Sequence, residues 1–157
     1  MEYTNKIPSK YSKKKESSFH INNVLSITSS VVGGLSLLFL LLPGISYTTG
    51  FYPTDGSFNL GAMTFGNNTF APLNIGLLIA FIFTILGIVF TALINVNKVA
   101  IASGMFAVVL FVTSAILYFC TVPLYGNLSA SLGSGAICLG VFNLICAIIT
   151  FIAASYK

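Results

Sequence analysis

The chain has 157 residues, of which 56% are hydrophobic and only 6% are charged. A soluble domain carries roughly a quarter of charged residues, so this composition excludes an ordinary soluble protein. The net charge of +4 comes from lysines that stand beside apolar stretches. It therefore indicates membrane topology and not binding to nucleic acid.

Residues 1–22 form a polar basic segment, with five lysines against two glutamates and no helical repeat of apolar residues. We expect a mobile cytoplasmic tail. Lys13, Lys14 and Lys15 form a cluster before the first apolar stretch, where they either bind anionic lipid headgroups or only fix the orientation of the chain. The lone His20 is expected to be a polar flank of that stretch.

Four apolar stretches are long enough to cross a membrane as α-helices, at about 23–42, 72–94, 99–119 and 132–154. The first ends at Pro43-Gly44, which is a helix stop. Its polar leader and apolar core are both too long for a signal peptide, so we expect a retained span. The sequence thus predicts an all-α membrane protein whose membrane domain, residues 23–154, is a four-helix bundle.

The lysine positions test this layout. With four spans, the N-terminal segment, the Asn95–Lys98 connector and residues 155–157 share one side, and all seven lysines lie there, whereas Asp55 lies opposite. The positive-inside rule then places both termini in the cytoplasm. Because the chain lacks Arg and Trp and is rich in Lys, Asn and Ile, we expect the cell membrane of a low-GC bacterium.

Small and polar residues repeat at heptad-like spacing along the fourth span: Ala136, Gly140, Asn143, Ala147, Thr150 and Ala154. Helices in lipid associate through close approach of small residues and through interhelical hydrogen bonds. We expect this seam, chiefly Gly140, Asn143, Ala147 and Thr150, to face other helices. Similar small or polar sets occur in the other spans: Ser29, Ser30, Gly33 and Gly34; Thr84, Gly87 and Thr91; Ala100, Gly104 and Ala107.

A functional alternative makes Asn143, Thr84 and Thr113 a polar path for an ion or a solute. Proton-coupled and charge-binding transporters usually carry an ionisable residue inside a span, and none lies inside these four stretches. The pattern therefore favours a packing role.

The segment 45–70 is the longest one that is neither strongly apolar nor rich in lysine. Period-two alternation predicts a strand from Ile45 to Phe51, Pro53–Gly56 predicts a turn, and Ser57–Phe65 predicts a second strand with a bulge at Gly61. A lone β-hairpin is marginal in water, so we expect it to rest on the second outer loop, near 122–128, or on a partner. The candidates for recognition in this loop are Tyr47, Phe51, Tyr52, Asp55 and Phe58.

Four spans, internal termini, a long β-rich first outer loop and a shorter second one resemble the claudin-type tetraspan architecture. The resemblance covers the whole chain as topology only. The claudin signature in the first loop contains Trp, Gly-Leu-Trp and a cysteine pair, whereas this chain has no Trp, and Cys120, Cys138 and Cys146 lie in or at the ends of predicted spans. No residue role is transferred from that family.

No nucleophile–base pair, paired carboxylates or Cys/His cluster stands out, so no catalytic, cofactor-binding or metal-ligating residue is predicted. We expect a non-catalytic accessory, scaffold or interaction subunit without a cofactor. Its partners would be the lipid bilayer and either another protein or a second copy, contacted through the spans or the outer loop. The alternative is a small transporter or channel subunit that lines its path as an oligomer.

Overall fold

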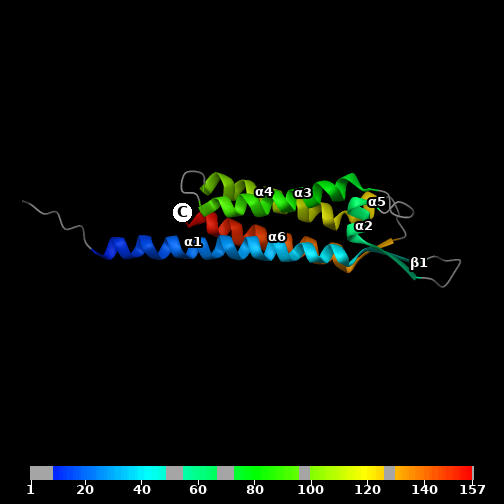
Figure 1. Ribbon diagram of the computed structural model, residues 1–157, viewed down its shortest axis with the longest axis horizontal. Coiled ribbons are helices and arrows are strands. Elements are labelled where there is room, and N and C mark those ends of the chain that lie inside the picture. The colour runs from blue at the N-terminus through cyan, green and yellow to red at the C-terminus, as the bar shows by residue number, and fades with distance from the viewer. Residues whose placement is uncertain (1–8, 49–54, 67–72, 96–99, 126–129, 157) are drawn as a thin grey trace, which may run out of the picture.

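The structure is a computed structural model that describes residues 9–48, 55–66, 73–95, 100–125 and 130–156. Figure 1 shows an elongated bundle of long helices with a small sheet at one end. The long helices are α1 (Ser9–Ser36), α3 (Ile75–Ala92), α4 (Ala100–Phe119) and α6 (Ser134–Ser155).

Four segments in the described part of the chain are long and apolar enough to cross a membrane: Asn23–Leu41, Ile75–Asn95, Ala100–Phe119 and Ser134–Ser155. The predicted four spans are confirmed, and their ends shift by a few residues at most. The first includes the short 3₁₀ helix η1 (Leu37–Leu41), and the second ends in η2 (Leu93–Asn95).

The four long helices form a closed ring, in which α6 packs against α1 and α4, and α3 packs against α4 and α1. Many small and hydroxyl-bearing side chains lie in the interior beside a few large ones such as Phe111 and Tyr118, whereas most large aliphatic side chains, such as Ile148, are exposed. A soluble bundle would bury most of its large apolar side chains. The observed arrangement is the one expected in lipid, where small residues let helices approach and large apolar ones face the acyl chains.

The first helix corrects one expectation, because residues 9–22 are helical, where the sequence predicted no helix. They continue α1 without a break to Ser9, giving a helix of 28 residues. Helix propagation costs little once a span has formed the nucleus, and this segment contains neither Pro nor Gly. In Figure 1 this part of α1 runs past the ends of the other long helices.

The sheet has three antiparallel strands, β1 (Pro43–Thr48), β2 (Asp55–Asn59) and β3 (Ala130–Leu132), in the order β2-β1-β3. Ile45 of β1 stands opposite Phe58 on one side and Leu132 on the other. The predicted pairing of two strands in the first outer loop is thus confirmed. The first two positions of the predicted turn, Pro53 and Thr54, lie outside the described residues, and the last two, Asp55 and Gly56, begin β2.

The second predicted strand is too long, because residues 60–65 form the short helix α2 (Leu60–Phe65). Asn59 begins this helix: its Oδ1 accepts a hydrogen bond from Gly61 N at 2.8 Å. An N-cap asparagine favours helix initiation, and the helix buries Leu60 and Met63 together where a strand would separate them. The predicted bulge at Gly61 is therefore wrong.

The second outer loop does contact the hairpin, as expected, but through a strand slightly further along the chain. The helix α5 (Thr121–Tyr125) precedes β3, which pairs with β1 and includes Leu132, a residue predicted to open the fourth span. We call the sheet, α2 and α5 together the cap. Its core of Ile45, Leu60 and Met63 rests on the ends of α3, α4 and α6.

Two asparagines join the cap to the bundle. Asn59 Nδ2 donates to the carbonyl oxygen of Leu41 at 2.6 Å, at the end of η1. Asn74 is the N-cap of α3, where its Oδ1 accepts from Leu77 N at 3.2 Å, and its Nδ2 donates to Leu124 O in α5 at 2.8 Å. Each amide satisfies backbone groups that a helix end leaves unpaired.

Candidate functional site

The first candidate site is a group of buried polar side chains near the sheet: Thr84, Ser114, Tyr118 and Asn143. We call it the sheet-side cluster. The Thr84 hydroxyl lies 2.7 Å from Ser114 Oγ and 3.3 Å from Asn143 Oδ1, so the cluster links α3, α4 and α6. Each hydroxyl carries a single proton, and both also lie close to the Ala80 carbonyl oxygen, at 3.0 and 2.8 Å.

Asn143 is held by its own helix as well as by its neighbours. Its Nδ2 donates to Leu139 O at 2.9 Å, and the side chain is almost completely buried. Tyr118 is fully buried, and its hydroxyl makes no hydrogen bond of standard geometry within the described residues, although Thr84 is near. Its ring belongs to the apolar core that also contains Ile45 of the cap.

A second group of buried polar side chains lies nearer the termini and consists of Ser26, Ser29, Thr91 and Thr150. We call it the termini-side cluster. Thr150 Oγ1 lies 2.8 Å from Ser29 Oγ and 3.2 Å from Thr91 Oγ1, and Ser26 Oγ donates to Thr91 O at 2.7 Å. These contacts join α1, α3 and α6.

An apolar layer lies between the two clusters and contains Ala107, Phe111, Cys146 and Ala147, all buried. The ring of Phe111 lies against Gly87, where an added Cβ would be 2.9 Å from the nearest ring carbon. Gly87 lies between Thr84 and Thr91 along α3, so this close contact fills the interior at the level that separates the clusters. The two clusters are therefore separate, and the buried hydroxyls of Ser36 and Ser103 bond within their own helices, to Gly33 O and Ala100 O.

The predicted seam of α6 lies inside the bundle. Asn143 belongs to the sheet-side cluster, Ala147 to the apolar layer and Thr150 to the termini-side cluster. Gly140 faces α4, where a Cβ would come within 2.7 Å of the Phe119 ring. The remaining seam residues, Ala136 and Ala154, are also buried.

The third member of the predicted polar path does not join the others. Thr113 is only half-buried, and its hydroxyl donates to Val109 O of its own helix at 2.8 Å. Its neighbour Ser114 takes the inward position instead. Sequence reasoning missed Ser114, although it extends the seven-residue spacing of Ala100 and Ala107, and it also missed Ser26 and Tyr118.

Of the outer-loop candidates, Phe58 is half-buried and packs against the cap core. Tyr47 and Asp55 belong to β1 and β2, and Phe51 and Tyr52 lie outside the described residues. Lys13, Lys14 and Lys15 lie in the part of α1 that precedes the span beginning at Asn23.

The described residues contain no group of three or more His, Cys, Asp or Glu side chains that could hold a metal ion. Cys120, Cys138 and Cys146 are free thiols. The chain matches no protein-family model, no curated protein and no solved structure.

Proposed function

We propose that this chain is a non-catalytic multi-pass protein of the cell membrane that acts as an accessory, scaffold or interaction subunit. One observation carries the proposal: the buried polar side chains that link different helices form two clusters, and a packed apolar layer lies between these clusters. Hydrogen bonds of this kind hold membrane helices together. The remaining surfaces available for function are the lipid-facing sides of the bundle and the cap.

The arrangement of the ends supports the proposed orientation. In Figure 1 the N-terminal part of α1 and the end of α6 lie at one end of the bundle and the sheet lies at the other. We propose that the lysine-bearing end is cytoplasmic and the cap extracytoplasmic, following the positive-inside rule. The resulting topology is similar to the claudin type.

A flux assay tests this proposal against an oligomeric transporter or channel subunit. Purified protein in liposomes is expected to pass Na⁺, K⁺, Cl⁻ and protons no faster than protein-free liposomes do. Asn143→Leu is expected to lower stability by about 0.6–2 kcal/mol through loss of interhelical bonding. The matched control Thr113→Val should leave stability unchanged, because Thr113 bonds only within its own helix. Flux that wild-type protein supports and Asn143→Leu abolishes would contradict the proposal.

Cross-linking in native membranes tests the interaction role itself. A photoreactive residue is placed at one exposed position on each candidate surface: Leu38 in η1 of the first span, Val109 on α4, Phe151 on α6 and Ser57 on the cap. We expect a discrete protein adduct from one surface and lipid adducts from the spans that face only the bilayer. An adduct of twice the chain mass identifies a second copy. The absence of a protein adduct at all four positions counts against an interaction subunit.

A further inference from the structure

Exposed apolar residues that a water-facing surface would not need lie where the cap meets the start of α3. Phe65, at the end of α2, is 49% exposed, Leu73 is 50% exposed, and Ile75, the first residue of α3, is 67% exposed. We call these three residues the apolar rim. Its side chains are large, and residues 56–66 and 73–95 contain no charged residue.

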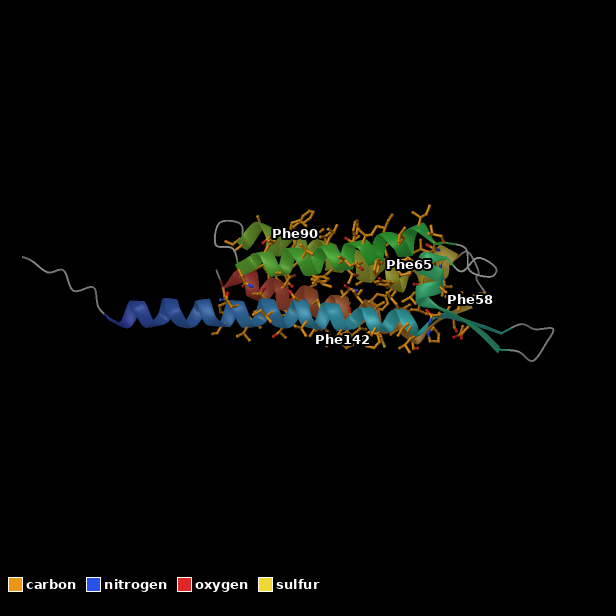
Figure 2. The ribbon with its side chains drawn as sticks, in the orientation of Figure 1. Phe58, Phe65, Phe90 and Phe142 are labelled. Atoms are coloured by element: carbon orange, nitrogen blue, oxygen red, sulfur yellow. The ribbon has the colours of Figure 1, made fainter. Side chains whose placement is uncertain are left out.

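The rim lies alongside α3 rather than beyond its end. The rings of Phe65 and Phe81 meet edge to face with their centroids 5.0 Å apart. Phe81 is six residues beyond Ile75, which at about 1.5 Å per residue is roughly 9 Å along the helix axis. Figure 2 shows Phe65 beside α3, whereas Phe58 lies nearer the sheet. The end of α2 is therefore level with the first turns of a membrane span.

The rim also continues a surface that faces lipid. Along α3 the exposed large apolar residues recur at helical spacing: Ile75, Ile79, Ile82, Leu86 and Val89. Ile75 belongs both to this stripe and to the rim, so the exposed apolar surface of α3 reaches the start of the span, next to the cap.

Several backbone groups at this level are paired through Asn74. Asn74 N donates to Met63 O at 3.0 Å, in addition to the two bonds of the Asn74 side chain. An unpaired backbone group in contact with hydrocarbon costs several kcal/mol. The Asn74 amide satisfies both the start of α3 and the end of α5 behind the rim.

We propose that the apolar rim is immersed at the boundary between headgroups and acyl chains of the leaflet on the sheet side. Its ligand is the upper part of the lipid acyl chains, and Phe65, at the end of α2, anchors the cap to the bilayer. Apolar side chains of interfacial helices lie about 5–10 Å into the boundary region. The inference is independent of the proposed function.

Tryptophan fluorescence tests this directly because the chain contains no Trp. Three single-Trp variants are compared in phosphatidylcholine vesicles: Phe65→Trp in the rim, Ser57→Trp on the exposed surface of β2, and Val109→Trp on the lipid face near the middle of α4. Vesicles contain lipids brominated either near the top of the acyl chain or near its methyl end.

We expect Phe65→Trp to emit at shorter wavelength than Ser57→Trp and to lose more emission to the shallow bromines than to the deep ones. Val109→Trp should show the opposite order of quenching. If Phe65→Trp emits like Ser57→Trp and responds only to a water-soluble quencher, the cap stands clear of lipid and the proposal fails. It also fails if Phe65→Trp emits at short wavelength but no bromine quenches it, because protein then covers the rim. Leu73→Trp provides a second rim reporter if Phe65→Trp does not purify as a monodisperse protein.

Discussion

Glycines in the spans of this chain have different surroundings, and the difference decides what a methyl group would do there. A Cβ on Gly87 would lie 2.9 to 3.1 Å from three ring carbons of Phe111, whereas a Cβ on Gly34 would meet nothing within 4 Å. At Gly87 the missing side chain lets α3 and α4 approach at the apolar layer. Gly34 lies on the exposed face of α1, and its missing side chain does not allow a close contact with another helix.

Gly87→Ala and Gly34→Ala are a matched pair of variants that compare a packed glycine with an exposed one. Gly87→Ala is expected to destabilise the bundle by about 1–3 kcal/mol, because the Phe111 ring must leave its position in a packed interior. Gly34→Ala should be neutral or stabilising by up to about 1 kcal/mol, since alanine favours the helix. Thermal unfolding in detergent, followed by circular dichroism, compares the two. Equal melting temperatures for both variants would mean that the contact of Gly87 with Phe111 contributes little.

Which residues turn inward could be predicted from the sequence where small or polar residues recur at helical spacing. All six residues of the α6 seam are buried, and so are the shorter predicted sets of α3 and α4. Thr113 and Ser114 are adjacent hydroxyl residues, and only Ser114 continues the seven-residue spacing of Ala100 and Ala107 into the interior.

At the scale of elements, Asn59 marks the change from β2 to α2. Its side chain caps α2 and also bonds the Leu41 carbonyl, while Leu60 N donates to Leu42 O at 2.9 Å. One residue thus ends a strand, starts a helix and fixes both against the end of the first span.

Asn59→Ala is expected to loosen α2 specifically. Loss of an N-cap costs about 0.5–2 kcal/mol, which corresponds to roughly 2- to 30-fold faster amide exchange in the helix it caps. Hydrogen exchange followed by mass spectrometry measures this for a peptide covering residues 60–65. Ser57→Ala, at an exposed position of β2, is the control and should leave exchange of that peptide unchanged. Unchanged exchange in Asn59→Ala would show that packing of Leu60 and Met63 holds the helix without the cap.

The first outer loop shows which elements a local sequence pattern can predict and which it cannot. The two strands could be predicted because alternation and turn residues are local signals. The helix at 60–65 could not, since alternating Phe58, Leu60 and Ala62 fit a strand equally well and the burial of Met63 depends on α3. Likewise β3 has three residues next to a span, and only its pairing with β1 makes it a strand.

At the scale of the whole molecule, charged residues are concentrated at one end of the bundle. The lysine-bearing part of α1 lies at one end of the bundle, and the nearly uncharged cap lies at the other. A bilayer around the bundle would separate these two ends.

Cysteine accessibility tests the orientation. In a background where Cys120, Cys138 and Cys146 are replaced by Ala, Ser57→Cys should react with a membrane-impermeant maleimide in intact cells. Ser12→Cys should react only after the cells are permeabilised. The positive-inside rule gives this direction, since the lysines are retained on the cytoplasmic side. The reversed pattern would place the cap in the cytoplasm.

The order of strands in the sheet has a consequence for biosynthesis. The central strand β1 is made directly after the first span, but β3, one of its two partners, follows the third span. A ribosome must therefore deliver three spans to the membrane before the sheet can close, and until then one edge of β1 has no partner strand. Closure of the sheet therefore requires the third span and β3 but not the fourth span, and nascent chains that stop before Ala130 would expose an open β1 edge to the chaperones and proteases that act during membrane insertion.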